Sequence, residues 1–220
     1  MTGWLDAVGG YRSRDEVDGH GFDFRPRWWQ TRVPEPSWAA FLDDLREAER
    51  GRGYRHITRA DMVAVATGPL PVPAVLVAAY AWGTGDGAFL APRRARVFRD
   101  TPPGDLTHRL TGVRDLLATS DAAAAYASLL PGGANRIKHL GPSFFTKLLY
   151  ALDPSRRALI LDRFVAIALR DITGWPLSST GPWTVDEYTR WLDWAHARAA
   201  KDGVHPDAVE MALFSYGKTL

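Results

Sequence analysis

The chain contains no cysteine among its 220 residues. This absence excludes a disulfide framework, a thiolate zinc site, an iron–sulfur cluster and a cysteine nucleophile. Lysine is also scarce, because only four of the 27 basic residues are lysines: Lys138, Lys147, Lys201 and Lys218. Arginine therefore carries most of the positive charge. This bias reflects either a G+C-rich coding sequence or a use for guanidinium groups that bind phosphate.

No apolar run reaches the roughly 20 residues that a membrane-spanning helix needs. The longest run, around 72–82, begins among prolines, and the first ten residues lack the pattern of a signal peptide. The six histidines show no metal-ligand spacing, and no glycine-rich nucleotide-binding motif is present. We therefore expect a cytoplasmic protein that has no membrane contact and needs no metal or cofactor.

Apolar residues recur at spacings of three and four along most of the chain, which predicts an all-α protein of about ten helices. Residues 1–33 show no clear period and are expected to form an irregular N-terminal arm, followed by one helical domain over 34–220. No strand-like alternation extends over more than a few residues. The expected helices cover 37–50, 58–66, 73–82, 105–119, 121–130, 143–152, 162–172, 185–200 and 206–217.

The most informative segment is 135–171, NRIKHLGPSFFTKLLYALDPSRRALILDRFVAIALRD. It predicts a short helix, a tight Gly141-Pro142 turn, a second helix, an apolar approach and a third helix that opens at Asp162. The start of a helix presents free backbone N–H groups, which form a ready anion site. We therefore expect the turn to bind a phosphate through four residues: Lys138, His139, Gly141 and Ser143.

Lys147 lies in an apolar run with Phe144, Phe145, Leu148 and Tyr150. An ammonium ion is poorly solvated there, which favours the neutral and nucleophilic amine. Fifteen positions later, Asp162 opens the next helix, so that two consecutive helices can place an amine beside a carboxylate. The alternatives are a lysine whose charged end reaches solvent and an ordinary N-cap aspartate.

The stretches LGPSFFTKLLY and LILDRFVAIAL resemble the helix-hairpin-helix DNA glycosylases, specifically the 8-oxoguanine glycosylase branch. In that superfamily a lysine of the hairpin's second helix and a later aspartate are catalytic. The resemblance implies these roles for Lys147, within Thr146-Lys147, and for Asp162, within Leu161-Asp162. It also implies two helical halves that flank a cleft. This sequence departs from the family's hairpin loop by lacking one of its glycines.

The last predicted helix contains Glu210 and Phe214, which match a polar residue and an aromatic four positions apart in the family. Positions i and i+4 share a helix face. An ionised carboxylate accepts two hydrogen bonds, which suits the adjacent N–H groups of guanine-type bases. We expect Glu210 to bind that edge and Phe214 to stack on the flipped base. A surface glutamate and a core phenylalanine are the alternatives.

Together these features predict a monomeric, nucleoid-associated DNA glycosylase with AP lyase activity, acting on 8-oxoguanine in double-stranded DNA by base flipping and a lysine Schiff base. One alternative is a glycosylase for another damaged or phage-modified base, and a second is a non-catalytic helical DNA-binding protein. The arginine cluster at 93, 94 and 96 either contacts DNA or is a solvated surface feature.

Overall fold

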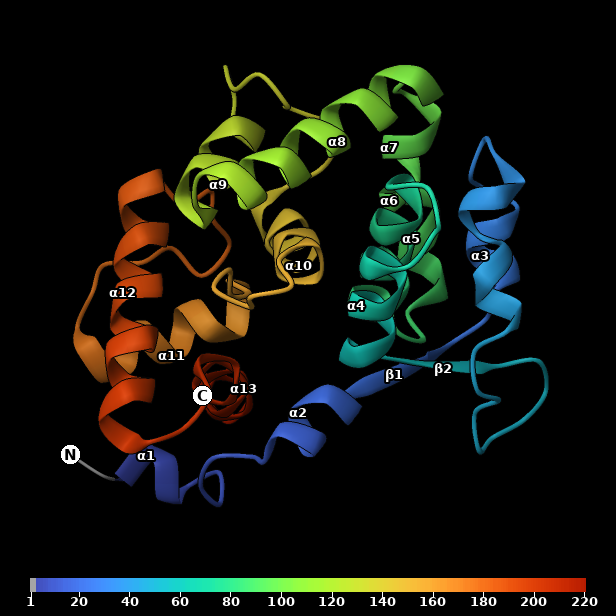
Figure 1. Ribbon diagram of the computed structural model, residues 1–220. Coiled ribbons are helices and arrows are strands. Elements are labelled where there is room, and N and C mark those ends of the chain that lie inside the picture. The colour runs from blue at the N-terminus through green and yellow to red at the C-terminus, as the bar shows by residue number, and fades with distance from the viewer. Residues whose placement is uncertain (1–2) are drawn as a thin grey trace.

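A computed structural model of the protein describes residues 3–220 and is mostly helical, which confirms the all-α expectation (Figure 1). The helices are α1 (Gly3–Asp6), α2 (Arg14–Gly19), α3 (Arg27–Gln30), α4 (Arg59–Thr67), α5 (Pro73–Thr84), α6 (Ala91–Arg94), α7 (Arg96–Arg99), α8 (Pro103–Thr119), α9 (Ala122–Leu129), α10 (Pro142–Leu152), α11 (Arg163–Thr173), α12 (Val185–Asp202) and α13 (Pro206–Gly217). Short 3-10 turns are η1 (Pro36–Trp38), η2 (Ala40–Asp43) and η3 (Ala88–Leu90). None of the helices within the described residues is long and apolar enough to cross a membrane.

The helices form two groups (Figure 1). One contains α9, α11, α12 and α13, and the other contains α3 to α7 with a small sheet. Helix α8 lies across the top, and α10 lies between the groups and packs on α5, α4, α9 and α8. Its last eight residues, Phe145–Leu152, are all buried. Helix α10 therefore carries side chains from the centre of the fold.

The core contains one fully buried helix, α5, and one close helix crossing, between α11 and α13. Helix α5 buries every residue from Pro73 to Trp82, so it is apolar on all faces and central. Helices α11 and α13 pack tightly, because a Cβ at Gly217 would lie 2.0 Å from the Phe164 carbonyl oxygen. Glycine at this position permits the close crossing.

The strands β1 (Gly21–Phe24) and β2 (Arg55–Thr58), which the sequence did not predict, pair antiparallel with Gly21 opposite Thr58. Each strand has four residues, which is too short for a recognisable alternation. A Cβ at Gly21 would lie 2.4 Å from the Ile57 carbonyl oxygen, so the pairing requires glycine. Residues 3–33, expected as an irregular arm, contain α1, α2, β1 and α3.

The helix expected over 37–50 is wrong. The segment forms η1 and η2, which bury Trp38, Phe41 and Leu42. It then runs beside β2, where the Ala48 N–H donates to the Tyr54 carbonyl and an isolated bridge follows. The backbone of 46–48 thus finds partners in an extended neighbour rather than in a helix. Apolar spacing alone did not distinguish these solutions.

The short helix expected before Gly141 is also absent, since residues 131–141 form turns. Gly132 has a φ of 88° and His139 a φ of 68°, both in the left-handed region. A right-handed helix does not accommodate these values. The approach to α10 is therefore an extended series of turns.

Candidate active site

Helix α10 begins with Gly141 as its N-cap and Pro142 at its first position. Proline suits this position because its fixed φ is helical and its missing N–H would have no partner there. The next helix, α11, begins after Asp162, whose Oδ1 accepts from the N–H groups of Phe164 and Val165 at 3.1 and 3.3 Å. The capping bond fixes one carboxylate oxygen of Asp162 and leaves the other for a further partner.

That partner is Lys147 of α10. Its Nζ lies 3.3 Å from Oδ2 of Asp162 and donates to the Ser143 carbonyl oxygen at 2.8 Å. The two side chains are 7 % and 13 % exposed. The structure thus brings together the amine and the carboxylate that the sequence placed on consecutive helices. Both side chains are therefore mostly buried but still in contact with solvent.

Thr146 links the two segments that carry this pair. Its Oγ1 accepts from the Leu161 N–H at 3.2 Å and donates to the Leu161 carbonyl at 3.0 Å or to the Pro142 carbonyl at the same distance. Thr146 and Leu161 are both buried and each directly precedes one member of the pair. The hydroxyl therefore sets the register between Lys147 and Asp162.

A pocket of about 350 Å³ opens at the amine, between the two groups of helices; we call it the lysine pocket. Its lining residues are Phe22, Trp82, Gly83, Arg94, Ser143, Phe144, Lys147, Asp162, Arg163, Phe164, Phe214 and Lys218. Five of these are aromatic. Flat, polarisable walls beside an amine and a carboxylate suit a planar ring attached to a polar group.

The end of α5 approaches Lys147 closely. Lys147 Nζ lies 6.0 Å from the ring centroid of Trp82 and 5.4 Å from that of Phe144. A Cβ at Gly83 would lie 2.9 Å from the Cδ of Lys147. Sequence reasoning missed Trp82 and Gly83, which lie more than 60 positions before the lysine. A glycine and a tryptophan at the end of an apolar helix gave no local signal of this role.

Phe214 lines the lysine pocket, as a base-stacking residue would. Its ring meets Phe164 edge-on at 5.6 Å and His20 at 5.8 Å. His20 also packs edge-on against Phe22 and Trp82. Burial, with the nearby Arg59 charge adding to it, lowers the pKa of His20 to about 4. A neutral imidazole therefore supports the aromatic walls at neutral pH.

Glu210 does not line this pocket, contrary to the expected contact with a base edge. Both of its oxygens accept from Arg59 of α4, at 2.6 and 3.0 Å, and the two side chains are 1 % and 0 % exposed. Burial raises the pKa of Glu210, and the Arg59 charge opposes that effect. Because the carboxylate is buried in the core and paired with Arg59, it is not accessible to a base in the lysine pocket.

The residues expected to hold a phosphate are distributed around the turn before α10. Lys138 and Gly141 are exposed, and Ser143 faces the lysine pocket. His139, next to Lys138 in the chain, pairs through its Nε2 with Asp100 at 2.8 Å. Joint binding of a phosphate by these four residues stays a prediction.

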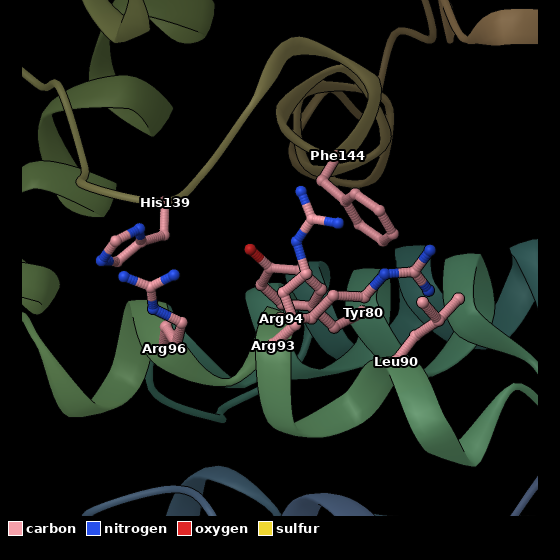
Figure 2. A pocket seen from close by; sticks show the side chains of 7 residues that line it. All are labelled: Tyr80, Leu90, Arg93, Arg94, Arg96, His139 and Phe144. Carbon is pink, nitrogen blue, oxygen red and sulfur yellow. The ribbon is translucent and has the colours of Figure 1, made fainter.

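His139 instead lines a second pocket, of about 390 Å³, which we call the arginine pocket (Figure 2). Its lining residues are Tyr80, Leu90, Arg93, Arg94, Arg96, His139 and Phe144. Arg96 and His139 lie together at one end, and Arg93 and Arg94 lie toward Phe144 (Figure 2). Arg94 and Phe144 line both pockets, so the two pockets adjoin at these side chains.

Within residues 3–220, no three acidic or histidine side chains are grouped so that they could hold a metal ion. The chemistry open to the site is that of an amine, a carboxylate and aromatic walls. An amine held beside a proton acceptor can act as a nucleophile toward an electrophilic carbon. A helical protein with such a pair in a pocket between two groups of helices has the layout expected of a base-excising enzyme.

The family described as "Putative 8-oxoguanine DNA glycosylase OGG-like protein" matches residues 15–214. The match covers most of the chain, and the protein belongs to this family. No curated protein and no solved structure matches the chain significantly. Membership supports a DNA glycosylase-like function on a DNA substrate.

Proposed function

We propose that this protein excises 8-oxoguanine from double-stranded DNA and then cleaves the strand as an AP lyase. The observation that carries the proposal is the 3.3 Å contact between Lys147 Nζ and Asp162 in an aromatic pocket. The damaged nucleotide leaves the duplex and enters the lysine pocket, where Phe214 stacks on the base. The walls exclude much of the water around the sugar.

In the proposed reaction, Asp162 takes a proton from Lys147, and the neutral amine attacks C1′ of the deoxyribose. The bond from C1′ to the base breaks, and the base leaves with the electron pair and gains a proton. Opening of the sugar ring gives a Schiff base at C1′, and loss of a C2′ proton then expels the 3′ phosphate. The carboxylate of Asp162 also stabilises the positive charge that develops on the sugar.

Borohydride trapping tests this chemistry directly, because reduction converts the Schiff base into a stable covalent adduct. Wild-type protein is expected to trap on an 8-oxoguanine duplex, and Lys147→Gln to give no adduct. Asp162→Asn should abolish turnover and leave DNA affinity largely intact. Lys201→Gln, which removes an exposed lysine of α12, is the matched control and should trap like wild type. Absence of an adduct under any condition and on every lesion duplex would instead indicate a non-catalytic DNA-binding protein.

One observation favours a second candidate, a glycosylase for a different damaged or modified base. Glu210 is engaged by Arg59, and Asp162 is the one carboxylate among the residues that line the lysine pocket. Glu210 is therefore not available to accept hydrogen bonds from the N–H groups of a guanine-type base. A panel of lesion duplexes separates the two candidates, since excision of an alkylated adenine or uracil without 8-oxoguanine activity favours the second.

A further inference from the structure

The arginine pocket carries positive charge that the rest of the protein does not neutralise. Its lining contains no carboxylate. Asp100 lies nearby and pairs with His139 at 2.8 Å and with Arg96 at 3.9 Å. Among residues 3–220, neither Arg93 nor Arg94 forms an ion pair. Two guanidinium groups without a counter-charge therefore face the same space.

Arg94 is held in place by uncharged groups. Its guanidinium donates to the Thr84 hydroxyl at 2.6 Å and to the Gly83 carbonyl at 3.3 Å, and it lies 4.4 Å from the centroid of the Phe144 ring. Burial lowers the pKa of Arg94, and the neighbouring Arg93 charge adds to this effect. A partly desolvated, oriented guanidinium gains more from an anion than a fully solvated one does.

The position of Arg94 relates this charge to the lysine. Arg94 lines both pockets, and the Gly83 that accepts its hydrogen bond lies directly against Lys147. A ligand that reaches Lys147 with one part and carries an anionic group on the adjacent part would place that group near Arg94, where the two pockets adjoin. A nucleotide has this form, because its sugar is bonded directly to phosphate.

We propose that the arginine pocket binds a backbone phosphate bonded to the sugar of the flipped nucleotide. Arg94 makes the direct contact, and Arg93 adds charge. The inference rests on the proposed glycosylase function and adds the group that holds the nucleotide's backbone while Lys147 reaches C1′. It also assigns a role to the arginine cluster that the sequence left open between DNA contact and a solvated surface.

The test measures equilibrium binding to a duplex that carries a reduced abasic-site analogue, so that neither base identity nor catalysis matters. Each phosphate around the analogue is replaced in turn by an uncharged methylphosphonate, and each duplex is titrated with wild type and Arg94→Gln at several salt concentrations. Arg114→Gln, which removes an exposed arginine of α8, is the control. Arg94→Lys keeps the charge and serves as a second variant if Arg94→Gln does not fold.

We expect Arg94→Gln to bind about tenfold more weakly and to lower the slope of log K against log salt by about 0.9. One methylphosphonate next to the analogue should weaken wild type by a similar factor and have no further effect on Arg94→Gln. Arg94→Lys should keep the salt slope and recover part of the affinity. Arg114→Gln should match wild type.

Two outcomes overturn the inference and are distinct from each other. If wild type prefers the abasic duplex but every methylphosphonate affects Arg94→Gln and wild type equally, the phosphate assignment is wrong and the glycosylase proposal stands. A contact between Arg94 and a base would give this same result. Each methylphosphonate would then weaken binding by Arg94→Gln as much as binding by wild type. If wild type shows no preference for the abasic duplex, the proposed function itself fails.

Discussion

Replacing Glu210 by glutamine distinguishes a structural role from base recognition. The buried Arg59 would keep its charge but lose its counter-charge, since the two side chains are 0 % and 1 % exposed and form a two-point pair. Removing one partner of such a pair costs about 3–5 kcal/mol. The amide oxygen of glutamine still accepts one hydrogen bond, so we expect the free energy of unfolding to fall by about 3 kcal/mol, the lower end of this range. For a chain of this length this lowers Tm by roughly 6–12 °C.

Thermal and urea unfolding measure this loss, and excision by the folded fraction is measured separately. The double variant Arg59→Met, Glu210→Leu supplies the control. Replacing both charges by apolar side chains leaves no buried charge unpaired, so it should recover most of the lost stability. If Glu210→Gln instead unfolds within about 1 °C of wild type and loses excision, the carboxylate binds substrate and the structural reasoning is refuted.

Three further predictions concern groups around the lysine pocket. Thr146→Val leaves two buried backbone groups of Leu161 without their partner, so we expect a loss of about 1–3 kcal/mol in urea unfolding and slower borohydride trapping, both restored by Thr146→Ser. Gly83→Ala should displace Lys147 and Phe144, because the added Cβ would lie 2.9 Å from Lys147 Cδ and 2.8 Å from the Phe144 ring, and should lower the trapping rate at least tenfold. The helix propensity of alanine offsets part of the packing cost in Tm; unchanged trapping would show that the site has room for a methyl group. The folded pKa of His20, about 4, lies below its ordinary value of 6.5, so protons bind the unfolded chain first and stability is lost as pH falls from 6.5 toward 4. His20→Phe should lose less stability than wild type between pH 7 and pH 5, and equal losses would contradict the assignment.

The sequence predicted the part of the site whose geometry is set by neighbouring segments. Lys147 lies on α10 and Asp162 is the N-cap of the next helix, α11, with residues 153–162 between the two helices. The Thr146 contacts with Leu161 then follow from the same register. A juxtaposition over 15 residues was therefore predictable from the order of the helices together with the family resemblance.

The role of Glu210 could not be predicted from its spacing to Phe214, which indicates only that the two residues share a helix face. One turn of a helix advances about 5.4 Å along its axis. On α13, Phe214 therefore reaches the lysine pocket, whereas Glu210, one turn earlier, lies in the core. There it pairs with Arg59, which lies 151 positions earlier in the chain. Arg59 showed no sequence signal, because an arginine after a helix N-cap is usually solvated.

Trp82 lies close to two ion pairs that differ in their exposure to solvent. The ammonium of Lys147 lies 6.0 Å from the centroid of its ring and the guanidinium of Arg59 lies 5.2 Å from it. The first pair borders the lysine pocket, whereas the second is closed off within the core. A side chain that transfers a proton must be able to change its protonation state. Access to solvent permits this change, whereas burial in a two-point ion pair with arginine opposes it. Of the two carboxylates that the sequence offered for chemistry, burial therefore leaves Asp162 open to the lysine pocket and makes Glu210 a link between α4 and α13.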